Sequence, residues 1–261
     1  MSPGKDSPKK TLRDLQAEHA PPPARRRAVP KTEAAEQSKV RNYVRDLILG
    51  FNDGLVSVYA IVAGVAGAAF ASGQIAIAGL AAAVAGALSM GLGEYLSTKS
   101  QSEYYAAEAE RERAHIRKYP QLEKQEVREM LEAKDYPPEI IDRVVTHVTS
   151  DEDRFVEFMM REEFGVGEES DRSPLIAMGL VMVAFVIGAA FPLIPFLFDV
   201  SPLRGLAIAT VLSLGGLFAA GAAKAVLSGL NPFRSGFEML LLGAIAAAIT
   251  YGVGLLFGVA V

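Results

Sequence analysis

The sequence predicts an all-α membrane protein with five transmembrane helices and a cytoplasmic helical bundle inserted between the second and the third. Two observations predict this class. The chain of 261 residues is 51% hydrophobic yet 21% charged, which suits an ordinary globular domain poorly unless the charges are segregated. They are segregated: of 30 acidic residues, five lie in residues 1–45 and 20 lie in residues 101–172. Most of the remaining chain is therefore apolar enough to enter lipid.

Residues 1–40 are the first expected segment. They contain PKK, PPPARRR and AVPKTE and almost no large apolar side chain, so we expect a disordered basic arm. Up to residue 45, 11 basic and five acidic residues leave a net charge of +6. We favour a solvated tail that helps to orient the protein over a specific ligand site. No signal peptide is visible, because the first apolar run is too long for one.

Five apolar runs are each long enough to cross a hydrocarbon core of roughly 30 Å. They occupy about residues 47–70, 75–98, 175–198, 203–228 and 236–260. An odd number of spans places the termini on opposite sides of the membrane. The basic arm then places the N-terminus and the insert in the cytoplasm and the C-terminus outside. Short loops and Ala- and Gly-rich spans favour a bacterial plasma membrane over a vacuole.

The chain thus divides into the arm, spans one and two in residues 41–100, an acidic insert in residues 101–172, and spans three to five in residues 173–261. The 11 basic and 20 acidic residues of the insert give it a net charge of −9. No Pro or Gly interrupts the chain from Glu94 to Tyr119, so the second span should continue as one helix up to Pro120.

Three further helices are expected in the insert. The first covers about residues 121–134. The next begins with Pro138 in its first turn and shows an apolar stripe on one face. The last is capped by Ser150 together with Asp153 and ends before Gly165.

The first two predicted spans each contain one acid, Asp53 near the start of the first and Glu94 near the end of the second. At 1.5 Å per residue, Asp53 lies roughly 9 Å, Met90 roughly 12 Å and Glu94 roughly 6 Å from the cytoplasmic face. Met90 and Glu94 also share one helix face. An acid at this depth is costly unless it faces protein, water or a cation. We favour a cation path through these three residues over an acid that only caps its helix.

Small residues follow Asp53 along the same face of the first span. Such faces let transmembrane helices approach closely, so Asp53 should point into a helix contact. We expect a two-fold contact between subunits at the small residues Ala60, Gly64, Gly67 and Ala71.

The insert carries a second group of candidate ligands. They are spaced three or four residues apart on three of its helices: Glu108, Glu112 and His115; Glu123 and Glu126; Met159, Met160 and Glu163. Carboxylates with an imidazole and a thioether suit Fe²⁺ or Mn²⁺ better than Cu⁺. Spacing alone favours a solvated acidic surface over a metal site. Glu112-x-x-His115 also matches half of a di-iron motif, but the second half is missing.

Three motifs carry a resemblance to a known family: RDLILGFNDGLVS at 45–57, SMGLGEYLSTKSQSE at 89–103 and FMMREEFG at 158–165. Together they resemble the vacuolar iron transporter family, which includes related manganese transporters, and the likeness covers about residues 41–261. The resemblance implies a homodimer that exchanges a divalent metal for protons.

The resemblance also implies roles for individual residues. Asp53 and Met90 match residues that line the ion path of the family, and Glu94 matches the glutamate of its GEY motif. The metal ligands of its insert match Glu112, Glu123, Glu126, Met159 and Glu163. His115 stands where a glutamate is usual and Met160 where a further acid can lie, so this site is softer and less charged. Met159 is expected at its rim.

We therefore expect a transporter that exports Fe²⁺ or Mn²⁺ from the cytoplasm, with no permanently bound cofactor. Its partners are a second copy of the chain, membrane lipid, metal ions and protons, and no nucleic acid. The alternative is a membrane-anchored metal sensor or storage protein, but a bare anchor has no use for an acid among small residues. An enzyme is not expected, because the sequence shows no nucleophile–base pair or phosphate-binding glycine loop. It contains no Cys, so neither disulfides nor a thiolate metal site are expected.

Overall fold

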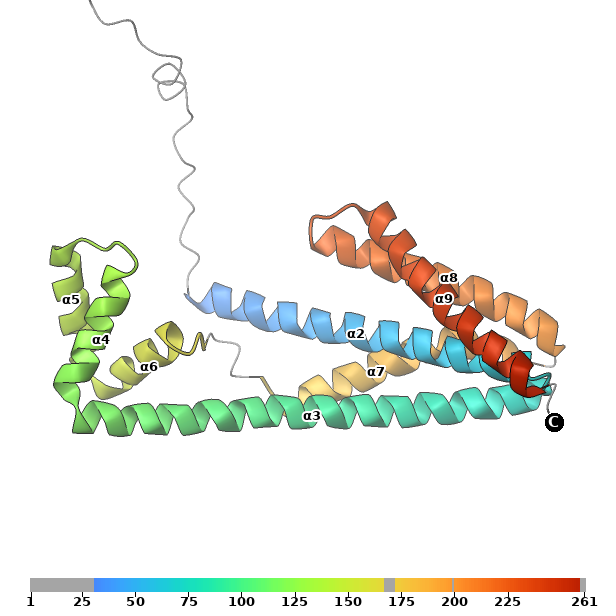
Figure 1. Cartoon of the computed structure of the whole chain (residues 1–261), viewed down its shortest axis with the longest axis horizontal. Helices are drawn as coiled ribbons and strands as arrows, with labels where there is room; N and C mark the ends of the chain where they lie inside the picture. The colour runs from blue at the N-terminus through green and yellow to red at the C-terminus, as the bar shows by residue number, and fades with distance from the viewer. Residues whose placement is uncertain (1–30, 167–171, 199, 259–261) are drawn as a thin grey trace, which may run out of the picture. The chain divides into compact units, whose positions relative to one another are not determined.

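A computed structural model describes residues 31–166, 172–198 and 200–258, with side chains from residue 41 onward. The features below belong to the compact unit Ala35–Val261, except that its first helix begins at Lys31. Every regular element of the described residues is helical (Figure 1). The elements are α2 (Lys31–Gly67), α3 (Ser72–Lys118), α4 (Pro120–Glu132), α5 (Pro138–Val148), α6 (Glu152–Glu162), α7 (Pro174–Leu193), the short 3₁₀ helix η2 (Ile194–Leu197), α8 (Pro202–Leu227) and α9 (Pro232–Gly258).

Five of these helices are long and apolar enough to cross a membrane, which confirms the predicted fold class. They are α2 from Arg41 onward, α3, α7 together with η2, α8 and α9. The expected disordered arm is wrong for residues 31–40, because α2 already begins at Lys31. Strong helix formers such as Ala, Glu, Gln and Lys dominate this stretch and favour the helix. The rest of the arm, residues 1–30, lies outside the described residues.

Helix α3 is one uninterrupted helix of 47 residues, as the absence of Pro and Gly after Glu94 predicted (Figure 1). At 1.5 Å per residue it is about 70 Å long, more than twice the thickness of a hydrocarbon core. Its apolar N-terminal half can cross a membrane, and its polar C-terminal half must continue beyond it. The helix ends where Pro120 begins α4.

The insert has an apolar core of its own. Side chains from the end of α3 and from α4, α5 and α6 pack together, with Val127, Ile141 and Phe155 almost fully buried among them. Pro138 lies in the first turn of α5, as predicted. The predicted cap of α6 is wrong by one residue, because Asp151 caps the helix by accepting a hydrogen bond from the Arg154 backbone N–H. Ser150 instead donates its hydroxyl to the His147 carbonyl.

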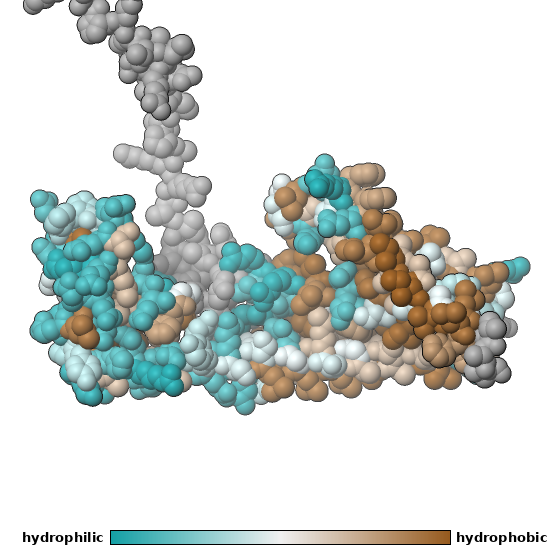
Figure 2. All heavy atoms as spheres, in the orientation of Figure 1, coloured by the Kyte–Doolittle hydropathy of each residue, from teal (hydrophilic) through white to brown (hydrophobic). Residues whose placement is uncertain are grey.

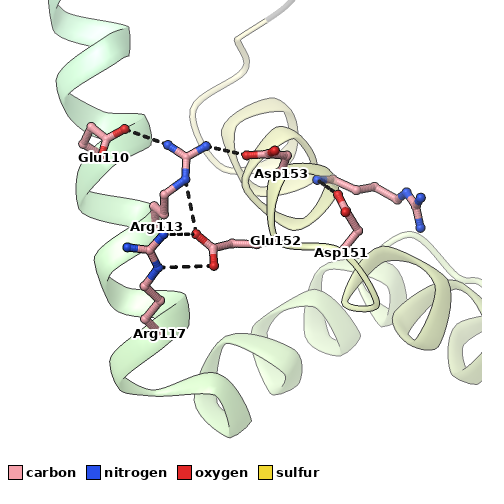
Figure 3. Close-up of polar contacts among 7 residues, drawn as sticks. Glu110, Arg113, Arg117, Asp151, Glu152 and Asp153 are labelled. Atoms are coloured by element: carbon pink, nitrogen blue, oxygen red, sulfur yellow. Dashed lines mark hydrogen bonds and ion pairs between the residues drawn. The ribbon is translucent and has the colours of Figure 1, made fainter.

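Ion pairs link α6 to α3 on the outside of this core (Figure 3). Arg113 of α3 contacts Asp153 at 2.6 Å and Glu152 at 3.3 Å. One turn further along α3, Arg117 contacts Glu152 at 2.7 Å. These pairs help to set how α6, which carries Met159 and Met160, lies on α3.

The surface of the spans suits lipid. Figure 2 shows hydrophobic residues over α9 and the N-terminal half of α3, and hydrophilic ones over α4, α5 and the C-terminal half of α3. Large apolar side chains such as Leu203 and Leu256 are 76% exposed, which lipid tails tolerate and water does not.

Glycines bring α2 into backbone contact with α7. A Cβ added at Gly54 would lie 2.1 Å from the Phe185 carbonyl oxygen, and one at Gly188 would lie 2.1 Å from the Phe51 carbonyl oxygen. No side chain fits at such distances, so the two helices cross with their backbones touching. This contact holds the turn of α2 that contains Asp53 against α7.

The second half of α2 packs on α9 in the same way. A Cβ at Gly67 would lie 2.5 Å from the Tyr251 carbonyl oxygen, and one at Gly254 would lie 1.9 Å from the Gly64 carbonyl oxygen. The predicted two-fold contact at Gly64 and Gly67 is therefore corrected, since these glycines serve a contact within the chain. Of the other two residues of that stripe, Ala60 is partly exposed and Ala71 is exposed.

Candidate metal path and metal-binding insert

Asp53 lies partly buried on α2, one residue before the Gly54 contact with α7. Its carboxylate accepts a hydrogen bond of 2.9 Å from the Ser57 hydroxyl, one turn further along the helix. This bond satisfies only part of what the two carboxylate oxygens can accept, so Asp53 retains capacity for a cation or a proton.

The other two predicted path residues lie on α3. Met90 packs against the apolar cluster that Val58 and Phe185 help to form. Glu94, one turn later, accepts a hydrogen bond of 3.1 Å from the Thr98 hydroxyl. The structure brings Glu94 to Arg172, whose guanidinium also binds Asp46.

Asp46 and Arg172 were missed by sequence reasoning. The guanidinium of Arg172, which lies just before α7, donates hydrogen bonds to Asp46 and to Glu94. Asp46 is 1% exposed and Arg172 is 9% exposed. Asp46 could have been found, because it lies seven residues before Asp53 and so on the same helix face. Arg172 carries no such signal, because its pairing depends on how α7 packs.

In the insert, the structure brings the predicted acids together around Glu112. Glu112 and Glu123 are 6% and 3% exposed, and the Oε1 atom of Glu112 has no hydrogen-bond partner. Burial, followed by the nearby carboxylates of Glu123, Glu163 and Glu126, raises the pKa of Glu112 to about 7. A solvated acidic surface, which spacing favoured, does not describe the two buried acids.

The neighbouring acids respond to the same environment. Burial, followed by the charge of Glu126, raises the pKa of Glu123. The same two causes raise the pKa of Glu163, at the C-terminal end of α6. Carboxylates from α3, α4 and the end of α6 therefore repel one another across a short distance, and a cation or a proton would relieve that repulsion.

The remaining predicted ligands are placed differently. The His115 side chain is 64% exposed, and its Nδ1 lies 3.8 Å from Glu123 Oε1, at the edge of the acidic group. Glu108 pairs with Arg111 at 2.6 Å and so already has a cation. Met159 is 0% exposed and Met160 is 7% exposed, both within the apolar core. The expectation of Met159 at the rim of the site is wrong, because α6 turns this side chain inward.

Among the described residues, no three His, Asp or Glu side chains already stand at distances that could hold a metal ion. The arrangement is thus a convergence of like charges and not a formed cage. Small movements of α4 and of the end of α6 against α3 would be needed to close ligands around an ion.

A family model described as the VIT family matches residues 44–255, most of the chain. The chain belongs to the VIT family. This match confirms the family that the three sequence motifs indicated. The matched range includes Asp46, Asp53, Met90, Glu94 and the whole insert.

Curated relatives of this VIT family member cover most of both chains. Vacuolar iron transporter 2 of Oryza sativa subsp. japonica is 37% identical over 209 residues, 80% of this chain and 85% of the rice protein. Vacuolar iron transporter 1 of Arabidopsis thaliana is 36% identical over 208 residues, 80% and 83% of the two chains. Protein CCC1 of Saccharomyces cerevisiae is 29% identical over 225 residues, 82% and 69% of the two chains.

These comparisons bear on two further expectations. The family and its named relatives are transporters and not enzymes. The relatives named above are eukaryotic, and the plant proteins are named for the vacuole, so they lend no support to a bacterial plasma membrane. That this is an integral membrane protein with several spans is shown.

Proposed function

We propose that this VIT family member moves a divalent metal ion, Fe²⁺ or Mn²⁺, out of the cytoplasm in exchange for protons. The relatives named as iron transporters support a metal cargo. The observation that carries the proposal is the continuity of α3. This one helix carries Met90 and Glu94 in its membrane half and Glu112 in the insert. The proposed metal site and the proposed membrane path therefore lie on the same continuous helix.

The insert is the collecting site in this proposal. At neutral pH the carboxyl of Glu112 is about half protonated, because its pKa is about 7. A divalent cation bound among Glu112, Glu123, Glu126 and Glu163 would replace that proton and neutralise the repulsion between the carboxylates. His115 would add a ligand from the edge of the group. Binding would thus release protons on the side where metal is taken up.

The membrane path then passes Glu94, Met90 and Asp53. Carboxylate and thioether ligands suit Fe²⁺ and Mn²⁺ without binding them too tightly to leave. A carboxylate in a low-dielectric site can hold either a cation or a proton, which is the basis of exchange. A homodimer remains part of the proposal, through a face other than Gly64 and Gly67.

Transport by purified protein in liposomes tests the proposal, and Asp53→Asn is the variant to compare. The amide keeps the shape of the side chain and the bond from Ser57 but removes the charge, so we expect a folded protein whose Fe²⁺ and Mn²⁺ transport is lost. Glu238→Gln is a matched control, because it removes an exposed acid from α9. Transport by Asp53→Asn at the parental rate would place the path elsewhere.

A membrane-anchored metal sensor or store is the second candidate. The observation that favours it is that the insert has an apolar core separate from that of the spans. An insert that folds around its own core could bind ions without help from the spans. Metal binding by the full-length protein, together with no metal movement in liposomes under any ion or pH gradient, would support this candidate over a transporter.

A further inference from the structure

Three charged side chains meet at a buried point between α2, α3 and the start of α7. One nitrogen of Arg172, Nη2, donates to an oxygen of Asp46 and lies 3.5 Å from Glu94 Oε1. The side chains of Arg172 and Asp46 are 7% and 2% exposed, and that of Glu94 is 19% exposed. The two acids come from the two helices that carry the proposed path.

The two carboxylates of Asp46 and Glu94 bind the Arg172 guanidinium in an unfavourable geometry. A guanidinium binds carboxylates best through two parallel bonds, but here a single nitrogen serves both acids. The Arg172 Nε is buried without a hydrogen-bond partner. Two carboxylates also face one buried cation, and the nearby Arg45, at 3.7 Å from Asp46, is 66% exposed and so screened by solvent.

The same geometry suits an ion that carries two charges. Asp46 and Glu94 supply oxygens from two helices to one point, and the Tyr43 ring lies 5.9 Å from the centre of the guanidinium. A divalent ion takes oxygen ligands at roughly 2.0–2.6 Å, so Glu94 would need to move inward by about 1 Å. The point lies one turn from Met90 along α3 and two turns from Asp53 along α2.

We propose that Arg172 is a specificity-determining residue of the transporter: it occupies Asp46 and Glu94 as a tethered cation, and only a divalent ion that bridges both carboxylates displaces it. The inference rests on the proposed function. A monovalent ion gains no more charge interaction than the guanidinium it would replace, whereas a divalent ion gains about twice as much at equal distance. The tether keeps the competitor at a high effective concentration.

A purely structural role for Arg172 makes a different prediction. Both roles predict that Arg172→Gln loses stability without metal, because two carboxylates are left without their buried partner. Only displacement predicts that Mn²⁺ restores the stability, since the ion then takes the vacated place. The response to metal therefore separates the two roles, and the loss of stability alone does not.

The test is thermal unfolding of the full-length protein in detergent, titrated with Mn²⁺ and separately with Na⁺. No variant changes the acidic group around Glu112, so differences between variants report the Arg172 position. For Arg172→Gln we expect half-maximal stabilisation at a Mn²⁺ concentration on the order of tenfold below that of the parent. We also expect Na⁺ to stabilise this variant and not the parent. Lys99→Gln, which removes an exposed cation of α3 that pairs with Glu103, should respond as the parent does.

Two further variants keep the proposal open to refutation. The double change Asp46→Asn with Arg172→Gln removes the pair of charges and should abolish the gain in Mn²⁺ response. If Arg172→Gln does not fold, Arg172→Lys carries the test, because its shorter and more localised charge should give a response between the parent and the expected Gln variant. An unchanged Mn²⁺ response in the folded variant would overturn the inference. Transport by the parent in liposomes separately decides the proposed function.

Discussion

Burial separates the acidic side chains of this protein into two kinds. Several exposed acids of the insert pair with a neighbouring Arg side chain, as Asp153 does with Arg113 and Asp142 with Arg128. Glu112 and Glu123 are buried, and their nearest charged neighbours are other acids. The fold keeps these groups at a cost in stability, which is typical of residues retained for binding and not for folding.

That cost predicts an unusual pH dependence for the metal-free protein. Glu112 ionises near pH 4.5 in an unfolded chain and near pH 7 in the fold, so the fold prefers the protonated form. Its contribution is most favourable below about pH 4.5, and it is lost as the pH rises towards about 7. Glu112→Gln should therefore stabilise the insert at about pH 8 and have little effect at about pH 5.

Thermal unfolding of the full-length protein in a metal chelator, at both pH values, measures this difference. Glu132→Gln, an exposed acid at the end of α4, is the control and should change neither value appreciably. If the difference in unfolding temperature between the parent and Glu112→Gln is the same at both pH values, Glu112 is solvated in the metal-free protein.

Sequence reasoning located the acids of the insert but not their environment. Spacing of three and four residues grouped Glu112 with His115 and Glu123 with Glu126, because helical periodicity is local. Whether a carboxylate is buried depends on how α4 and α6 lie on α3, and that depends on contacts distant in sequence. The same limit explains why the sequence did not indicate the acidic partners of Arg172. It also explains why Met159 was expected at the rim of the metal site.

Helix boundaries were more predictable, because Pro, Gly and charge patterns act locally. The unbroken α3 and the Pro starts of α4 and α5 followed from the sequence. The start of α2 did not, because residues 31–40, which are mostly polar and rich in helix formers, look the same in a tail as in a helix. The cap of α6 was misplaced by one residue, since Ser150, Asp151 and Asp153 are all plausible caps.

The cap offers a direct test. Asp151→Ala should destabilise the insert by about 1 kcal/mol, because the Arg154 backbone N–H loses its acceptor. Ser150→Ala should cost less, since its hydroxyl caps no backbone N–H: it donates to the His147 carbonyl and accepts from the exposed Arg154 guanidinium. Chemical unfolding of the two variants compares them. A larger loss for Ser150→Ala would restore the cap that the sequence suggested.

Backbone contact between α2 and α7 gives a second test at the level of helices. Gly188→Ala places a methyl group where the Phe51 carbonyl lies, so the helices must separate and the protein should lose most of its folded yield. Gly179→Ala on the same helix meets nothing within 4 Å and should be tolerated. Size-exclusion profiles of the two detergent-solubilised variants measure the contrast. Equal profiles would mean that α2 and α7 do not touch at this point.

One helix joins the acidic group of the insert to the proposed membrane path, and the proposed function thus differs from a carrier with a single site. The insert has its own core, and α3 links it to the layer of Glu94 and Met90. Fold class and the order of the parts were predictable, because charge segregation and span length are properties of composition. Which helix faces meet was not, as the use of Gly64 and Gly67 by α9 demonstrates.

If the two regions act in series, damage to each should have a different kinetic signature. The double change Glu123→Gln with Glu126→Gln weakens the insert but leaves Asp53 intact, so transport should slow at low metal concentration and recover at high concentration. The KM for Mn²⁺ should rise while kcat stays near the parental value, because collection and not passage is impaired. Asp53→Asn should lose kcat at every concentration.

Liposome transport over a range of Mn²⁺ concentrations distinguishes these patterns, with the exposed pair Glu129→Gln and Glu132→Gln as the control. A fall in kcat with unchanged KM for the double variant would mean that the insert acts within the passage step itself.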